Sequence, residues 1–360
     1  MRLKPLFSVG VGFIFVLAVG VAQAEGEVVF PTPESVASVP DEDAVLLLKR
    51  MAAAMQTTNY EGLLLHMRGG EARSMRVFHR YDAEHGEREH LLSLDGKPFE
   101  VIQDANGCTC VWPQARFMVV GQTPAFNGRL STERFAETRT LSSFYTITRQ
   151  DYARVGGMAC RLVKLEPKDA YRFSYRLCIH ESSAMLLNLE VFDGDRRLEL
   201  SQFTQMRVQR REDADDMRLF TNIEGFRVVK DMRPAPAAQP NASFQTSWVA
   251  TQLPQGYLLR SAELRTSPHT QKPLEQLIFS DGLGSVSVFI ERFDSAAAMP
   301  PPHPVHPPEA GRVPPPPRGA MQRVVRDVDG YRLTAVGDAP EAAMRMMLDG
   351  MQPSSPRAKE

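Results

Sequence analysis

The stretch ACRLVKLEPKDAYRFSYRLCI, residues 159–179, carries a cysteine near each end and alternates between polar and apolar side chains. If Cys160 lies opposite Cys178 in an antiparallel hairpin, one face of the hairpin is mostly apolar and the other mostly polar. The apolar face would hold Val163, Leu165, Phe173, Tyr175 and Leu177. A register slip of one residue would mix the two faces. The pattern therefore predicts a hairpin with Pro167–Tyr171 as its loop and a Cys160–Cys178 disulfide across it.

This cysteine pair is interpreted as a structural disulfide. A redox centre typically requires Cys-x-x-Cys at the start of a helix, and a metal site requires further Cys or His ligands at the usual spacings. Neither pattern occurs in the sequence. Cys108 and Cys110 lie two residues apart on a strand-like run, so they share a face and a bond between them would be strained. Bonds between these two cysteines and the hairpin remain an alternative.

The first residues have the features of a secretory signal peptide. A positively charged start precedes an apolar run from Leu6 to Val21, and Ala22-Gln23-Ala24 supplies a cleavage signal. The run is shorter than the roughly 20 residues that a membrane-spanning helix needs, which argues against the alternative of a retained anchor. We expect residues 1–24 to be a signal peptide and the mature chain to be located in the periplasm, where cysteines readily form disulfides.

Composition narrows the class of protein. The chain has 42 Lys and Arg against 43 Asp and Glu, so its charge gives no reason to expect nucleic acid as a partner. It is 43% hydrophobic, which is enough to bury ordinary cores, and its length favours two domains.

The first domain is predicted to span residues 25–231. Residues 41–55 place Val45, Leu48, Ala52 and Met55 at helical spacing. Short strand-like runs separated by Gly-containing turns follow this helix. They begin with YEGLLLHMR, RSMRVFHRY, REHLLSL, FEVIQD and CTCVWP. The pattern predicts one helix followed by an antiparallel meander, which forms a large curved sheet or an open barrel.

A second, smaller domain is predicted over residues 244–351, after a Pro/Ala-rich linker at 232–243. Its strands are EQLIFSDG, GSVSVFIERF and MQRVVRDVDGYRLTAVG, with a helix in PEAAMRMMLDGM and a tail at 352–360. Residues 300–318 hold so many prolines that they cannot join a sheet, and we expect an exposed loop. The fold class is α+β and rich in antiparallel strands.

The sequence offers no catalytic apparatus. Glycine loops for nucleotides, a nucleophile elbow, a zinc-protease motif and a kinase signature are all missing from it. EHGEREH, residues 84–90, gathers two histidines with acidic residues, but the spacing matches no standard metal site and is typical of a charged hairpin loop. The expectation is therefore a binding or regulatory protein, not an enzyme, with no cofactor and no metal.

An ordered set of motifs runs along the chain. In the first domain the motifs are Ser74-x-Arg76-x-x-His79, Leu94-Asp95-Gly96 before Glu100-Val101-Ile102, Val155-Gly156-Gly157-x-x-Cys160, Tyr171-Arg172-Phe173-x-Tyr175-Arg176-Leu177 and Leu198-Glu199-x-x-Gln202-Phe203. In the second they are Trp248 before Leu253-Pro254-x-Gly256-Tyr257, Ser280-Asp281-Gly282-Leu283 before Ser285-x-Ser287-Val288, and Val336-Gly337-Asp338-x-Pro340. Over nearly the whole mature chain this set resembles the RseB/MucB family of sigma-E regulators. Cys178, where the family more often has an aromatic residue, and the long proline-rich loop depart from it.

The resemblance implies a LolA/LolB-like unclosed β-barrel over a helix, plus a smaller α+β C-terminal domain. It also implies a periplasmic negative regulator of the envelope-stress sigma factor. Such a protein binds the periplasmic domain of a membrane anti-sigma factor and shields it from regulated proteolysis. An apolar concavity of the large domain would sense lipid or lipopolysaccharide. The alternative is a periplasmic lipid or lipoprotein carrier, and a homodimer is also considered as a partner.

Two groups of candidate binding residues follow from these expectations. The lipid-facing candidates, assigned by strand face alone, are Leu63, Leu65, Met67, Met75, Val77, Val163, Leu165, Phe173, Tyr175 and Leu177. Core packing is the competing interpretation, because any sheet packed on a helix needs such a face. Trp248 and Tyr257 are candidate partner-facing aromatics of the second domain, or members of its core.

Overall fold

The computed structural model describes residues 41–121, 132–208, 217–231, 246–267, 270–292 and 319–354. The expected signal peptide, the linker and the proline-rich loop lie outside the described residues. So do residues 355–360 of the expected tail.

Helix α1 (Glu42–Thr57) begins at a well-formed cap. The carboxylate of Asp41 accepts hydrogen bonds from the backbone N–H groups of Asp43 (3.0 Å) and Ala44 (3.3 Å), which would otherwise lack a helical partner. One stripe of the helix is buried: Ala44, Leu47, Leu48, Met51, Ala52 and Met55. The helix predicted over 41–55 is confirmed, although Val45 lies at the border of the buried stripe.

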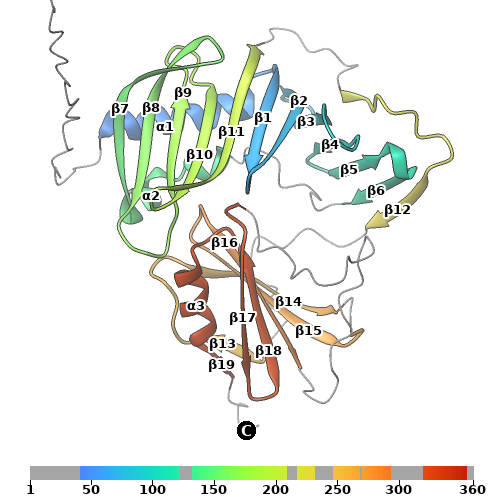
Figure 1. Ribbon diagram of the computed structural model, residues 1–360, viewed down its shortest axis with the longest axis vertical. Coiled ribbons are helices and arrows are strands. Elements are labelled where there is room, and N and C mark those ends of the chain that lie inside the picture. Colours follow the sequence, from blue (N-terminus) through green and yellow to red (C-terminus); the bar gives the residue numbers. More distant parts are fainter. Residues whose placement is uncertain are drawn as a thin grey trace, which may run out of the picture. The chain divides into compact units, whose positions relative to one another are not determined.

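The strands after α1 form one large sheet (Figure 1). They are β1 (Tyr60–Arg68), β2 (Glu71–Asp82), β3 (Gly86–Ser93), β4 (Glu100–Asp104), β5 (Gly107–Trp112), β6 (Phe117–Gly121), β7 (Tyr145–Val155), β8 (Met158–Pro167), β9 (Ser174–Ile179), β10 (Leu186–Asp193), β11 (Arg196–Val208) and β12 (Arg227–Asp231). Their order across the sheet is β12-β6-β5-β4-β3-β2-β1-β11-β10-β9-β8-β7. Neighbours run antiparallel except β12 and β6, which are parallel. Because β12 and β7 are its two edges, the sheet is not closed, and the predicted open antiparallel sheet is confirmed.

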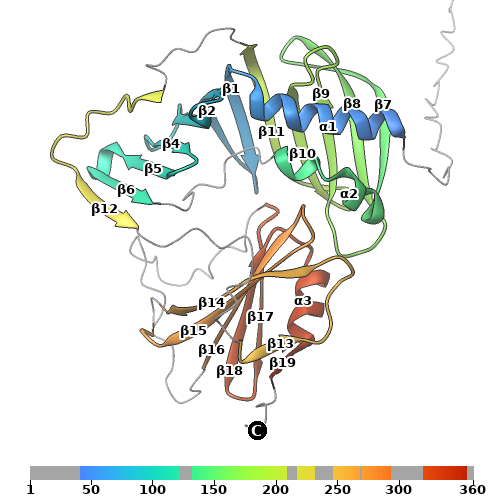
Figure 2. The same ribbon diagram turned by 180° about the vertical axis from the view of Figure 1, so that it is seen from behind.

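Helix α1 lies across one face of this sheet, as the two opposite views show (Figures 1 and 2). Its buried stripe joins side chains from most of the strands in a single hydrophobic core, for example Leu64 of β1, Leu91 of β3 and Leu177 of β9. Three short helices complete this region: η1 (Pro113–Ala115), η2 (Thr132–Phe135) and α2 (Thr138–Phe144).

The cysteine hairpin forms with the predicted faces but in a different register. Cys178 lies opposite Leu162, not Cys160, so every cross-strand pair is shifted by two residues from the prediction. A shift of two keeps each side chain on its face. The disulfide joins Cys160 to Cys178 diagonally, with a Cα–Cα distance of 5.5 Å. The assumption that bonded cysteines must stand directly opposite was wrong, because a diagonal pair also brings two Cα atoms within disulfide reach.

The second sheet holds β14 (Leu258–Thr266), β15 (Pro273–Ser280), β16 (Ser285–Arg292), β17 (Gln322–Val328) and β18 (Tyr331–Gly337), in the order β14-β15-β16-β18-β17. Helix α3 (Glu341–Asp349) packs on β17 and β18, and β13 (Trp248–Ala250) pairs with β19 (Met351–Pro353). The run 321–337, predicted as one strand, is a hairpin that turns at Asp329-Gly330, both with positive φ. β19 reaches into the expected tail. This unit has its own hydrophobic core.

Candidate binding faces and the Arg172 junction

Most of the lipid-facing candidates lie in the packed core between the large sheet and α1. Seven of them are buried there: Met75, Val77, Val163, Leu165, Phe173, Tyr175 and Leu177. Neither of the two pockets described below is lined by any of the ten candidates. A lipid that entered between sheet and helix would therefore have to displace packed side chains.

The other three candidates, Leu63, Leu65 and Met67, lie on the opposite face of β1, and their grouping with Met75 and Val77 was wrong. Leu64 is the residue of β1 that pairs with Met75 and enters the core. Three consecutive leucines fit either face, so their pattern cannot decide. Gly62 decides, because a Cβ there would meet the Phe203 ring at 2.7 Å, so only a glycine leaves room for that ring on the core side.

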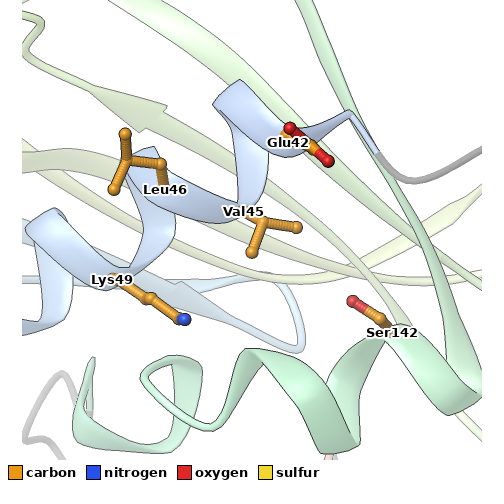
Figure 3. A pocket seen from close by; sticks show the side chains of 5 residues that line it. All are labelled: Glu42, Val45, Leu46, Lys49 and Ser142. Carbon is orange, nitrogen blue, oxygen red and sulfur yellow. The ribbon is translucent and has the colours of Figure 1, made fainter.

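A small apolar hollow lies beside α1 and is visible in Figure 3. It has a volume of about 360 Å³ and is lined by Glu42, Val45, Leu46, Lys49 and Ser142. Leu46 is 57% exposed, which is unusual for a leucine on a helix that packs on a sheet. The hollow offers an apolar wall with an ammonium group at its side, and it is large enough for one side chain of a partner. A second, more polar pocket of about 810 Å³ lies beside η1, lined by Arg116, Phe226 and their neighbours.

Trp248 and Tyr257 are core residues of the second unit and not surface aromatics. They are 2% and 3% exposed, and Trp248 meets the Tyr331 ring edge-on at 5.2 Å. A partner could not touch these rings in this conformation, so their assignment as partner-facing is corrected in favour of the core interpretation. Large aromatic side chains fill cores and interfaces equally well, and the sequence alone could not separate the two.

Arg172 connects the two sheets through a fully buried ion pair. It lies in the loop between β8 and β9, and its Nε donates to Asp281 Oδ2 of the β15–β16 turn at 2.7 Å. The two side chains are 1% and 2% exposed. Arg172 also donates to the Asp169 carboxylate and to the Gln255 carbonyl. Every one of these acceptors offsets part of the large cost of burying a guanidinium group.

Aromatic rings and tight turns surround this ion pair. The guanidinium carbon of Arg172 lies 4.1 Å from the centre of the Phe144 ring and 5.4 Å from that of Tyr257. Burial raises the pKa of Tyr257, and the neighbouring Asp281 carboxylate raises it further. The second oxygen of Asp281 accepts the N–H groups of Leu283 (3.0 Å) and Gly284 (2.8 Å) and so fixes its own turn. We call this group of residues the Arg172 junction.

A second bridge reinforces the junction. Arg134 of η2 donates to the Leu283 carbonyl at 3.1 Å, and the same nitrogen lies 3.5 Å from Asp338. Its guanidinium also stacks on Phe135 and Tyr175 of the large sheet's core. The sequence pattern singled out Tyr175 and Tyr257 only as candidate binding aromatics, and it singled out none of the charged residues of the junction as a site. The signal was nevertheless present, because Arg172, Gly256-Tyr257, Asp281-Gly282-Leu283 and Asp338 all belong to the motifs that carry the family resemblance.

A buried carboxylate holds a further segment on the other face of the sheet. Glu100 accepts hydrogen bonds from His90 (2.8 Å) and from the N–H groups of Phe220 (2.7 Å) and Thr221 (3.1 Å). The Phe220 ring stacks on His90 at 5.0 Å. Burial alone would raise the pKa of Glu100, but these hydrogen bonds outweigh it and lower the pKa below its ordinary value. We call residues 217–226, which this carboxylate clips to β4, the strap.

Family comparison accounts for both units. The models of the MucB/RseB N-terminal domain and C-terminal domain match residues 43–223 and 242–352. The chain belongs to the MucB/RseB family.

Relatives in this MucB/RseB family match much of the chain. The sequence is 24% identical to the sigma factor AlgU regulatory protein MucB of Pseudomonas aeruginosa over 328 residues, 88% of this chain and 93% of the relative. It is 27% identical to the sigma-E factor regulatory protein RseB of Haemophilus influenzae over 269 residues, 72% and 80% of the two chains. These relatives are named as regulatory proteins.

Solved structures of MucB/RseB family members show the same fold. MucB in complex with MucA(peri) has a TM-score of 0.63 and 23% identity, covering 87% of this chain and 100% of that one. MucB alone gives a TM-score of 0.58 at 22% identity, over 88% and 100%. No helix in the described part of this MucB/RseB chain is long and apolar enough to cross a membrane.

Proposed function

We propose that this protein is a periplasmic negative regulator of an envelope-stress sigma factor. It binds the periplasmic part of a membrane anti-sigma factor and shields that part from regulated proteolysis. The observation that carries the proposal is the match of both units to one regulatory family, together with the fold of a MucB chain that was solved in complex with MucA(peri). Its relatives are named as regulators and not as enzymes.

The two-unit construction suits a binding protein. The chain presents two hydrophobic cores, and in the described residues the Arg172 junction connects the two units. Relative motion of two such units is the ordinary expectation unless the interface between them is large and hydrophobic. A ligand that prefers one arrangement can then change partner affinity, but only by the difference between its own affinities for the two arrangements.

The proposal is tested by capture and by protection. The full-length mature protein, immobilised, should retain a detergent-solubilised single-span anti-sigma factor and slow its cleavage by the first protease of the cascade. Failure to capture it would contradict the proposal, as would a deletion strain whose envelope-stress transcription stays unchanged even when the downstream protease is released. Fractionation of cells should recover the protein with the periplasm.

Lipid sensing by the large domain is the finer part of the proposal. Since seven candidate residues are packed under α1, an acyl chain that binds there must move the helix away from the sheet. Lipopolysaccharide added during the capture experiment should then release the anti-sigma factor. The carrier alternative predicts instead that the pure protein moves acylated cargo between two membranes, and a reconstituted transfer assay separates the two functions.

A further inference from the structure

A row of aromatic side chains crosses one end of the large sheet. Trp112 of β5 lies opposite Phe117 of β6, and Phe117 lies opposite Arg227 of the edge strand β12. Phe99, just before β4, extends the row: its ring centre lies 5.1 Å from that of Trp112, which lies 5.5 Å from that of Phe117. The guanidinium of Arg227 stacks on Phe117 at 4.9 Å. We call these four residues the aromatic row.

The aromatic row lies on the core side of the sheet and is only half-buried. Phe99 and Trp112 pack against the hydrophobic core, so the row faces the same side as the strand residues that meet α1. Its three rings remain partly exposed and Arg227 is exposed. The row thus presents flat apolar surfaces with a cation at one end.

After residue 318 the chain returns to the large sheet at its central strands β1 and β11. The N–H of Ala320 donates to Glu199 Oε1 at 3.0 Å, and Arg68 pairs with the same carboxylate at 3.1 Å. Ala320 belongs to the core of the large sheet, so it is on the same face as the aromatic row. Arg68 ends β1, and following the registers of the hairpins from β1 to β6 places the row level with Leu64, four residues before Arg68.

We call Ala320, which is bonded to Glu199, the anchor. The segment before it has a composition that rows of aromatic side chains bind. Residues 300–318 read PPPHPVHPPEAGRVPPPPR. Proline-rich peptides favour the polyproline II helix, whose rigid, hydrogen-bond-free ridges bind between aromatic rings with little loss of conformational entropy. We infer that the aromatic row is a binding site for polyproline-type peptide and that its occupant is the proline-rich segment 300–318 of this chain.

Length and charge agree with this occupant. Six strand spacings of about 4.8 Å separate β1 from β12, and the row is offset from Arg68 by four residues of about 3.4 Å, so the Arg227 end of the row lies roughly 32 Å from Arg68. A polyproline helix advances about 3.1 Å per residue, so about ten residues before Gly319 cover that span. The tenth residue before Gly319 is Glu309, the single carboxylate of the segment, and it would meet the cation of Arg227.

The experiment uses the two tryptophans of the chain as reporters. Full-length protein labelled with 5-fluorotryptophan gives two ¹⁹F resonances, one from Trp112 in the row and one from Trp248 in the core of the second unit. Replacing residues 300–318 by a Gly/Ser linker of equal length should shift the Trp112 resonance and leave that of Trp248 in place. A synthetic peptide of residues 300–318 added to this variant should return Trp112 saturably toward its original position.

Matched controls decide the outcome. A peptide with alanine at every proline should bind at least about tenfold more weakly, because it lacks the preformed helix. Arg227→Glu should weaken the native peptide about two- to fivefold, and a peptide carrying Glu309→Arg should recover the loss. A native peptide that leaves Trp112 unmoved, or an alanine peptide that binds equally well, would overturn the inference. So would a Trp112 resonance that depends on protein concentration, because a second copy would then supply the segment.

Discussion

At the scale of single residues, Arg172 is the side chain on which the junction depends most. Arg172→Met removes the charge partner of a buried carboxylate, and breaking such a pair from one side costs about 3–5 kcal/mol. The double change Arg172→Met with Asp281→Asn should lose less, because no uncompensated charge stays buried. Urea unfolding measures the difference, and Arg196→Met, which breaks an exposed pair with Asp193, should lose under about 1 kcal/mol. Equal losses for the buried and the exposed arginine would contradict the assignment.

Gly256 is a second residue whose identity the junction requires. Its φ is +88°, and a Cβ would meet the Phe144 ring, which stacks on Arg172, at 2.3 Å. Gly70 has nearly the same φ, +83°, but open space around it. Gly70→Ala should therefore report only the backbone cost of about 1–2 kcal/mol, and Gly256→Ala should exceed it clearly. Thermal unfolding of both variants measures this, and similar losses would show that the Phe144 ring moves aside without cost.

At the scale of elements, the disulfide between β8 and β9 closes a loop of 18 residues. Cys160→Ala with Cys178→Ala should lower the free energy of unfolding by about 3 kcal/mol on the chain-entropy model. Cys108→Ala with Cys110→Ala is the matched control for loss of buried sulfur, since both of these cysteines are buried. Denatured, unreduced protein should show two titratable thiols, and a count of four would disprove the disulfide.

The strap should respond to acid through Glu100. Its pKa is lowered in the folded state, so its contribution to stability is complete above the ordinary glutamate pKa of about 4.3 and is lost as the pH falls below that value. Glu100→Gln should destabilise by about 1.5–3 kcal/mol at neutral pH, and the gap to the parent should narrow at low pH. Urea unfolding at several pH values measures the gap, and the exposed Glu71→Gln is the control. A gap that does not change with pH would contradict this role of the carboxylate.

An element can be predicted from the sequence when local signals determine it, and not when contacts between distant residues determine it. Tyr60–Arg68 was predicted to the residue, because turn glycines bound it on one side and a helix end on the other. The face of this strand that enters the core was not predicted, because Leu63–Leu65 fit either face. The contact between Gly62 and the Phe203 ring determines which face is buried. β12 and the Arg172 junction were missed for a common reason. Both depend on contacts between residues more than 100 positions apart, and no local period reports such contacts.

At the scale of the whole molecule, each unit contains one tryptophan, so the two cores can be watched separately in one sample. Trp112 belongs to the large sheet and Trp248 to the second core. In the parent protein the junction couples the cores, and the ¹⁹F signals of both tryptophans should disappear at the same urea concentration. Arg172→Met weakens this coupling and should move the two transitions apart, whereas Arg196→Met should leave them together. Transitions that already differ in the parent protein would show that the junction couples the two units too weakly for one to report the state of the other.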